Sequence, residues 1–166
     1  MLKIRDLEPR DKDGLSSFIT EIYKEYPTSM WFESEPTPVM LSKLFDHKLS
    51  AMLEKNIVDI VAVEGGEDGA EAVLGELEIA RLAGPIGYIG IIIRKDRRGK
   101  GLGSMLLERA CAQASLLGIT DLRAEIVEEN TAARKLFEKY EFLLESGEAK
   151  NGPTGSKVVL YRRAMK

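Results

Sequence analysis

The sequence predicts a single α/β domain, in which about four helices pack on one mixed, mostly antiparallel sheet of about seven strands. Two observations predict this class. Short apolar runs of strand length alternate along the chain with stretches in which apolar residues recur at helical spacing. The 166 residues also contain no internal repeat and no linker, so residues 1–166 are expected to form one domain.

Each expected element follows from its local pattern. Apolar residues recur at helical spacing from Leu15 to Tyr23, and Thr37 before Pro38 suits the start of a second helix. The turn GEDG joins two strands, and Gly118 suits the end of a helix. In chain order we expect a strand at 1–8, a helix ending near Pro27, a helix beginning at Thr37–Pro38, strands at 57–66, 72–82 and 87–94, a helix at 102–118, a strand at 122–127, a helix at 131–140, and a closing hairpin of strands at 141–146 and 156–165.

Composition limits the class of protein. With 44% hydrophobic and 31% charged residues and a net charge of −3, the chain has the balance of a globular protein that does not bind polyanions as a whole. No apolar run approaches the roughly 20 residues that span a bilayer, and the first residues do not resemble a signal peptide. The single cysteine, Cys111, excludes an intramolecular disulfide. We therefore expect a cytoplasmic monomer or homodimer without nucleic-acid or membrane partners.

The segment RRGKGLGSML, residues 97–106, stands between an expected strand and an expected helix. The N–H groups at a helix N-terminus and the positive end of its dipole favour phosphate, and glycines let a ligand approach the backbone. Arg97, Arg98 and Lys100 add positive charge. A Walker turn is excluded because Gly101 follows Lys100, and a dinucleotide fingerprint is excluded because Leu106 stands where its last glycine belongs. A glycine-rich connection with solvated charges is the structural alternative.

Two motifs together resemble the GNAT superfamily, the acyl-CoA-dependent N-acetyltransferases. The run from Arg98 to Gly103 has the form R-x-x-G-x-G of their pyrophosphate turn. The stretch from Asn130 to Phe142 is similar to their second signature, N-x-x-A-x-x-L-Y-x-x-x-G-F, with Phe137 in place of its tyrosine and Glu141 in place of its glycine. The resemblance covers about residues 58–145. It implies the GNAT fold, with splayed central strands.

The resemblance also implies acetyl-CoA as co-substrate, with no metal. The coenzyme's pyrophosphate would bind the N–H groups of the turn, and its pantetheine arm would lie along the preceding strand like an added strand. Asn130 matches a pantetheine contact, with a helix N-cap as the structural alternative. The expected cofactor-binding residues are Ile91, Ile92, Ile93, Arg98, Gly99, Lys100, Gly101, Leu102, Gly103, Ser104, Asn130, Ala133 and Phe137.

The catalytic roles come from the same resemblance. The segment AEIVEEN is similar to the L-E-V-R-x-x-N strand of the family's protein N-terminal acetyltransferases, which makes Glu125 the expected base. A solvent-facing glutamate is its alternative, and Glu76 and Glu78 are further candidates. The N–H of Ile93 is the expected oxyanion donor. Phe137 cannot donate a proton, so any acid help would come from residues that sequence does not rank, namely Tyr88, Tyr140 and Tyr161.

The acceptor is expected to be an amine. A peptide or protein N-terminus is favoured by AEIVEEN, while a small amine or polyamine and a non-catalytic CoA-binding module remain alternatives. Acidic residues would attract a cationic acceptor, and Tyr26, Trp31 and Phe32 could shape its pocket. With Cys111 in mid-helix and His47 in a charged stretch, we expect neither a cysteine nucleophile nor a zinc site. The acidic residues are Glu64, Glu67, Asp68, Glu71, Glu76, Glu78, Glu125, Glu128 and Glu129.

Overall fold

The computed structural model describes residues 1–27, 34–66, 70–145, 150–151 and 155–165. They form one twisted sheet with the strand order β1-β2-β3-β4-β5-β8-β6, and β7 also pairs with β8. All neighbouring strands are antiparallel except β4 and β5, which are parallel. The strands are β1 Leu2–Asp6, β2 Ile57–Gly65, β3 Glu71–Arg81, β4 Ile86–Ile93, β5 Asp121–Val127, β6 Leu143–Leu144, β7 Lys150–Asn151 and β8 Lys157–Ala164.

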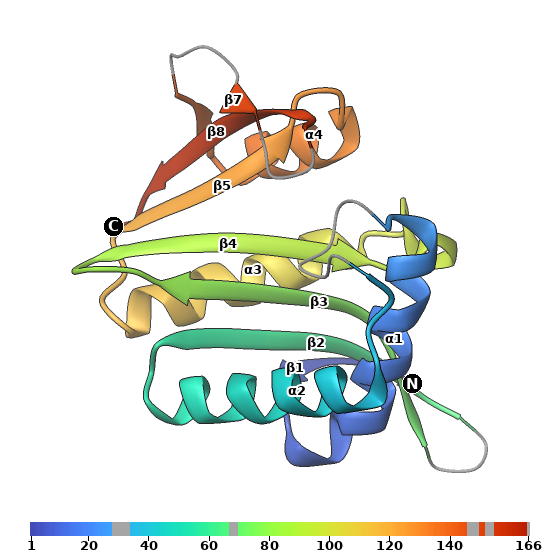
Figure 1. Ribbon diagram of the computed structural model, residues 1–166. Coiled ribbons are helices and arrows are strands. Elements are labelled where there is room, and N and C mark those ends of the chain that lie inside the picture. Colours follow the sequence, from blue (N-terminus) through green and yellow to red (C-terminus); the bar gives the residue numbers. More distant parts are fainter. Residues whose placement is uncertain (28–33, 67–69, 146–149, 152–154, 166) are drawn as a thin grey trace.

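Four α-helices cover the two faces of the sheet. They are α1 Lys12–Glu25, α2 Pro38–Leu53, α3 Leu102–Leu116 and α4 Thr131–Lys139, and two short 3₁₀ turns, η1 Pro9–Asp11 and η2 Lys95–Arg97, precede α1 and α3. Figure 1 shows α1 and α2 in front of the sheet and α3 behind it. The predicted start of α2 is confirmed, because the Thr37 hydroxyl accepts the N–H of Met40 at 3.3 Å.

Each face of the sheet has its own core. The core under α3 and α4 contains Ile60 and Leu77 from the first strands and Leu122, Ala124 and Ile126 from β5. The other core joins α1 and α2 to alternate residues of the same strands. Because side chains alternate across a strand, the two cores indicate which face the strand residues occupy, except at a bulge where the β2–β3 register shifts at Ala62 and Val63. None of the described helices is long and apolar enough to cross a membrane.

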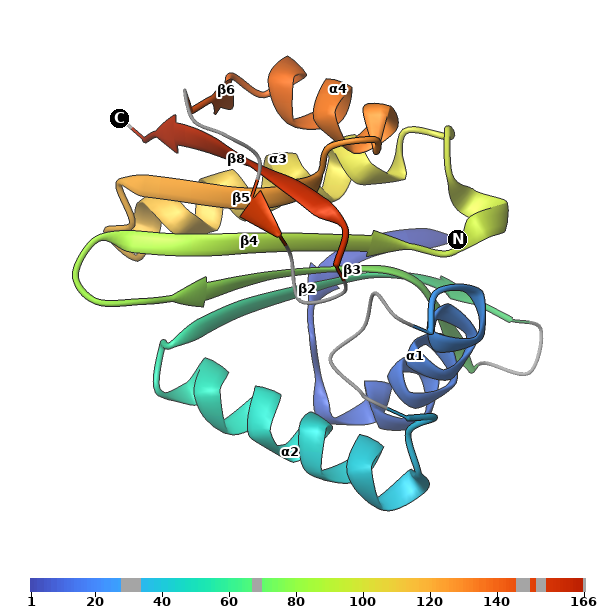
Figure 2. The same ribbon diagram turned by 45° about the horizontal axis from the view of Figure 1, so that its top comes forward.

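Strands β4 and β5 pair only at one end. Their register runs from Ile86 opposite Asp121 to Tyr88 opposite Arg123 and then stops, although β4 continues to Ile93 and β5 to Val127. Figures 1 and 2 show the two ribbons diverging beyond this point. The fold predicted from the sequence, including its splayed central strands, is therefore confirmed. The closing hairpin differs in detail, because only Leu143 and Leu144 of the expected strand at 141–146 pair with β8, and the short β7 makes an eighth strand.

Glu141 explains why that expected strand begins late. Its φ of +63° lies in the left-handed region, which disfavours any residue with a Cβ. The resembled signature has glycine here, so the chain keeps the turn and bears the strain. Its carboxylate contributes little in return, because it is exposed and lies 3.5 Å from the Arg163 guanidinium.

Glu141→Gly should therefore stabilise the fold. The left-handed conformation costs a residue with a Cβ about 1–2 kcal/mol, and the extra freedom of unfolded glycine takes back part of that gain. We expect the free energy of unfolding in urea to rise by about 0.5–1 kcal/mol. Glu138→Gly, which places glycine inside α4, is the control and should lower it. A lower stability for Glu141→Gly would contradict this account of the turn.

Candidate active site

A glycine turn joins the end of β4 to α3. Gly99 and Gly101 have φ of +71° and +83°, and a Cβ built on either residue meets no atom within 4 Å. Gly101 is the N-cap of α3 without a side-chain cap, and the first helical N–H that finds a backbone acceptor is that of Met105. The N–H groups from Gly99 to Ser104 are therefore the candidates for binding an anion, and that role stays a prediction. Gly99, Lys100 and Gly101 are exposed, whereas Leu102 and Gly103 are buried.

Gly103 has a second reason to be glycine. A Cβ there would lie 2.8 Å from Cδ2 of Leu136 and 3.1 Å from Cδ1 of Ile93. The missing side chain therefore lets α3 approach both α4 and the end of β4. Ser104, next along the helix, is fixed to the end of α4, because its carbonyl accepts the Tyr140 hydroxyl at 3.0 Å. The turn is held by packing on two sides.

The guanidinium of Arg98 is committed to α1. It donates to both carboxylate oxygens of Glu25, at 2.6 and 2.9 Å, and to the hydroxyl of Tyr26 at 2.9 Å. Its Nε donates to the carbonyl of Ile93 at 2.9 Å. This pairing holds the pKa of Glu25 below its usual range. Arg98 thus ties the end of β4 to the end of α1.

Two of the three basic side chains at the turn have carboxylate partners. Arg97 forms an ion pair with Glu64, and Arg98 is engaged as above. Lys100 is exposed, and among the described residues it has no ion-pair partner. An anion at the turn would therefore be bound mainly by backbone N–H groups, with Lys100 as the adjustable cation.

Glu25→Gln should weaken this link without removing its bulk. A bidentate pair that is partly exposed contributes about 1 kcal/mol, so the free energy of unfolding in urea should fall by about that amount. Glu21→Gln, one turn earlier on an exposed surface of α1, is the matched control and should change it by less than about 0.5 kcal/mol. Equal losses in the two variants would mean that the Arg98 pair contributes nothing specific.

The exposed edge of β4 lies along the gap between β4 and β5. Ile91 and Ile93 pack partly against the core under α3, and Ile92 packs against the core of α1 and α2. The N–H of Arg94 donates to Leu74 of β3, while the carbonyl of Ile93 accepts from Arg98. Since N–H and C=O directions alternate along a strand, the N–H of Ile93 is directed away from β3, toward the gap. Its role as oxyanion donor stays a prediction.

Three predicted contacts lie on α4. Asn130 is the N-cap, its Oδ1 accepting the N–H of Ala133 at 3.0 Å, so the structural alternative for this residue is present. The exposed side chain leaves its amide nitrogen able to donate elsewhere. Phe137 is only 2% exposed and packs edge-on against Phe142, with ring centroids 4.9 Å apart. We therefore assign Phe137 to the core, because it has no surface to offer a cofactor.

Glu125 is exposed on β5. Its neighbours Ala124 and Ile126 point into the core under α3, so Glu125 points to the face on which α1 and α2 lie. Tyr88, Gly90 and Ile92 of β4 occupy the same face. If the β4–β5 register continued beyond Tyr88, Gly90 would stand opposite Glu125. The carboxylate is thus on the same face as α1 and α2, and its role as the base stays a prediction.

The other candidate residues differ in how far their side chains are exposed to solvent. Tyr161 is fully buried and donates to Glu138 at 2.7 Å, and Tyr140 donates to Ser104. Tyr88 is half-buried on the same face as Glu125. His47 is exposed. Cys111 is 7% exposed beside Arg163, and burial raises the pKa of its thiol, as expected of a structural cysteine.

The residues predicted to surround the acceptor are not gathered in one place in the structure. Trp31 and Phe32 lie outside the described residues, as do Glu67 and Asp68. Glu64 and Glu71 are paired with Arg97 and with Lys3 and Arg5, respectively, so they are not free to attract an acceptor. Glu76 and Glu78, on β3 directly beside β4, are also paired, in their case with Lys48. Within the described chain, no group of three His, Cys, Asp or Glu side chains is arranged to hold a metal ion.

A buried ionic cluster on this face was not predicted from the sequence. Lys48 of α2 lies 2.8 Å from Asp59, 2.9 Å from Glu76 and 2.5 Å from Glu78. Lys48, Asp59 and Glu76 are almost fully buried, whereas 26% of the Glu78 side chain is exposed. The helical spacing of Leu41, Phe45 and Lys48 could have revealed the cluster, because it places a cation on the buried stripe of α2.

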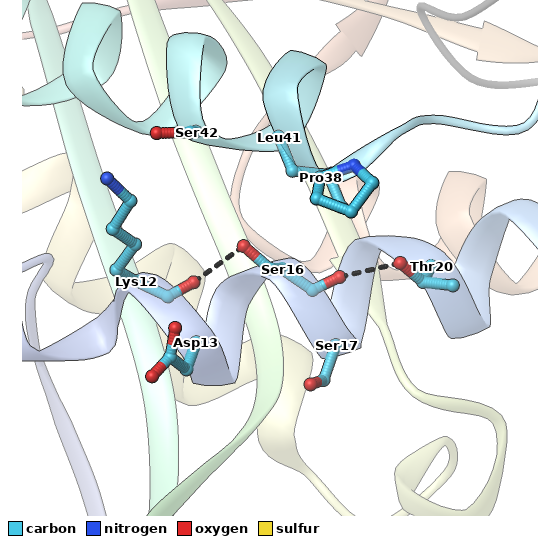
Figure 3. A pocket seen from close by; sticks show the side chains of 8 residues that line it. All are labelled: Lys12, Asp13, Ser16, Ser17, Thr20, Pro38, Leu41 and Ser42. Atoms are coloured by element: carbon cyan, nitrogen blue, oxygen red, sulfur yellow. Dashed lines mark hydrogen bonds between the residues drawn. The ribbon is translucent and has the colours of Figure 1, made fainter.

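A separate groove of about 440 Å³ runs between α1 and the start of α2 (Figure 3). Its hydroxyl groups are used locally, because Ser16 donates to the carbonyl of Lys12 at 2.7 Å and Thr20 to that of Ser16 at 2.8 Å. None of the residues predicted for the site lines this groove. We therefore place the candidate site at the gap between β4 and β5.

Comparison with known proteins identifies the family of this chain. The family model described as the acetyltransferase (GNAT) family matches residues 17–142, which include the glycine turn, β5 and α4. The chain belongs to the GNAT family of acetyltransferases. This confirms the resemblance and the enzyme class predicted from the sequence.

Individual members of the family match to different extents. A putative phosphinothricin acetyltransferase of Bacillus subtilis, YwnH, is 46% identical over 54 residues, so the match covers 32% of this chain and about one third (33%) of that relative. An acetyltransferase of the GNAT family from Streptococcus pneumoniae has a TM-score of 0.81 and 26% identity over 100% of both chains. The putative acetyltransferase YncA from Salmonella typhimurium, solved with acetyl-CoA, has a TM-score of 0.80 and 17% identity over 99% of this chain and 94% of its own.

Proposed function

We propose that this GNAT protein binds acetyl-CoA in the gap between β4 and β5 and transfers the acetyl group directly to a primary amine. The observation that carries the proposal is the early end of the β4–β5 pairing, which leaves the edge of β4 open beside a turn with available N–H groups. The acetyl-CoA in the similar Salmonella protein supports the choice of co-substrate.

The chain's own groups would bind the coenzyme in two ways. The N–H groups from Gly99 to Ser104, at the positive end of the α3 dipole, would bind the diphosphate, and Lys100 would add its charge. The backbone groups of Ile91 and Ile93 that face the gap, where the Ile93 carbonyl already accepts from Arg98, would hydrogen-bond the pantetheine amides as an added strand does. Asn130 would donate its amide nitrogen. The thioester would then lie along β4, on a fixed backbone rather than on mobile side chains.

The transfer step needs few further groups. The amine nitrogen attacks the thioester carbonyl carbon, the carbon–sulfur bond breaks, and the electron pair leaves with sulfur as the CoA thiolate. The N–H of Ile93 would stabilise the developing oxyanion, and Glu125 would take the proton that the amine loses, directly or through one water. A thiol pKa near 8.5 makes a thiolate a tolerable leaving group without a proton donor. The phenylalanine at position 137 is therefore compatible with activity.

The acceptor class follows from the same residues. We favour a peptide or protein N-terminus, because the strand AEIVEEN resembles that branch of the family and places Glu125 on the open face. An α-amino group, with a pKa near 8, also loses its proton more easily than an alkylammonium, with a pKa near 10.4. A small amine or polyamine is the second candidate, and the acidic residues Glu78 and Glu125 on this face favour it.

The proposal can be tested with the purified protein, acetyl-CoA and a panel of acceptors. The panel should contain neutral peptides with a free N-terminus, spermidine and simple alkylamines. Release of free thiol that depends on one acceptor, with an increase of one acetyl group in the mass of that acceptor, is the expected result. Binding of CoA without acetylation of any amine would overturn the proposal and favour a non-catalytic CoA-binding module.

A further inference from the structure

The buried cluster around Lys48 opens at only one member. Lys48 is 1% exposed, Asp59 0% and Glu76 3%, measured on their side chains, and the exposed surface of the cluster belongs to Glu78. On the sheet, Glu78 stands between Asp59 of β2 and Gly90 of β4. Asp59 is fully buried and Gly90 is exposed, so Gly90 is the open neighbour of Glu78 on the sheet.

Gly90 leaves a hollow between two carboxylates. A Cβ built on this exposed residue would meet no atom within 4 Å. Glu78 pairs across the strands with Gly90, and Glu125 lies on β5 across the gap that opens where the β4–β5 pairing ends at Tyr88 and Arg123. All three residues are on the face of α1 and α2. Glu78, Gly90 and Glu125 therefore form a row in which two carboxylates lie on either side of the open space over Gly90.

Resting on the proposed function, we propose that Glu78 and Glu125 bind the acceptor as a cationic amine between them, over Gly90, and that Lys48 positions Glu78. Glu78 is thus a binding residue, and Lys48 acts through it. The acceptor class is an amine that arrives as its ammonium ion, rather than a neutral amine or an anionic substrate.

The charge balance of the cluster supports this class. One lysine faces three carboxylates, and one oxygen of Asp59 is buried without a hydrogen-bond donor among the described residues. Burial and the nearby Glu76 raise the pKa of Asp59 well above its usual value. Carboxylates outnumber lysines in the cluster, and its most exposed carboxylate is Glu78, where an ammonium ion would neutralise negative charge.

The described cations near Gly90 are already paired with carboxylates, which disfavours an anionic acceptor. Arg123, on the same face, donates to Asp121, which also accepts from Arg162. Lys48 already has three carboxylates around it. These two cations of the described residues are therefore both paired, and an ammonium acceptor would bring its own positive charge.

Two variants test the inference by different routes. Glu78→Gln keeps the shape of the side chain and an oxygen for Lys48, and it removes one negative charge. Gly90→Val fills the hollow, which has room for the added atoms, on a strand that favours β-branched residues. Glu108→Gln, the same charge change on the exposed surface of α3, is the matched control. The probe is whichever panel amine the unmodified protein acetylates.

We expect Glu78→Gln and Gly90→Val each to raise the KM for the amine by about tenfold or more, which corresponds to the loss of one charge-assisted contact of about 1.4 kcal/mol. The Kd for CoA, measured by calorimetry, should change by less than about twofold in both, which also shows that the fold is retained. Glu108→Gln should alter neither value.

The outcomes separate this inference from the proposed function. An unchanged KM for the amine in both variants, with the unmodified protein active, would overturn the inference and leave the acetyltransferase proposal standing. A rise in KM for Gly90→Val alone would place the acceptor over Gly90 and remove Glu78 from its binding. Acetylation of no amine by the unmodified protein would overturn both proposals.

Discussion

Glu125→Gln should lower kcat for amine acetylation by about two orders of magnitude, because a positioned base typically contributes a factor of 10²–10⁴. Glutamine keeps the size of the side chain but cannot accept the proton that the amine loses. The expected pattern is a fall in kcat with little change in the Kd for CoA, since Glu125 lies across the gap from the glycine turn. Thiol release under saturating acetyl-CoA and calorimetric titration with CoA measure the two quantities.

The control for this variant is Glu128→Gln. Glu128 is exposed just after the end of β5. It differs from Glu125 mainly in that it lies beyond the part of β5 that borders the gap. It should leave kcat within about twofold. If Glu125→Gln retains full activity, or if its pH–rate profile is identical to that of the unmodified protein, the base must be another group. Glu78 would then be the first candidate, because it is the second partly exposed carboxylate in the same row.

How far the fold could be predicted depends on whether a feature is determined by residues that are close in sequence or by residues that meet only in the folded chain. Local signals were sufficient where they act within one turn: Thr37 caps α2, and Gly118, with φ of +70°, follows the end of α3. The splay of β4 and β5 is different, because it depends on which strands pair and for how long. It was predicted from the two motifs through a resemblance, since no periodicity in either strand shows where pairing stops.

The candidate site was predictable to the extent that backbone groups form it. Glycines at 99 and 101 directly imply an open turn, and the structure agrees. The partners of long side chains were not predictable: the sequence gives no sign that Arg98 reaches Glu25 on α1. Lys48 was missed for the opposite reason. Its place on the apolar stripe of α2 was visible, but its three carboxylates come from β2 and β3 and meet it only in the folded chain.

The second large effect is expected at Gly101, where backbone conformation and ligand binding coincide. Gly101→Ala puts a Cβ on a residue with φ of +83°, at a cost of about 1–2 kcal/mol, and that atom enters the open space above the turn. Both the strain and the added atom act on the N–H groups that the diphosphate would approach. The Kd for CoA should therefore rise about tenfold or more, a loss of at least about 1.4 kcal/mol in binding.

The same helix provides a matched control for the strain. Gly118 has φ of +70°, and a Cβ on it would also meet no atom within 4 Å, but it lies at the other end of α3. Gly118→Ala should therefore lower the free energy of unfolding by a similar amount, about 1–2 kcal/mol in urea, and leave the Kd for CoA unchanged. If both variants weaken CoA binding equally, the effect reflects general destabilisation. If neither does, the N–H groups at the start of α3 do not bind the diphosphate, and the gap beside β4 loses the anchor on which the proposed transfer depends.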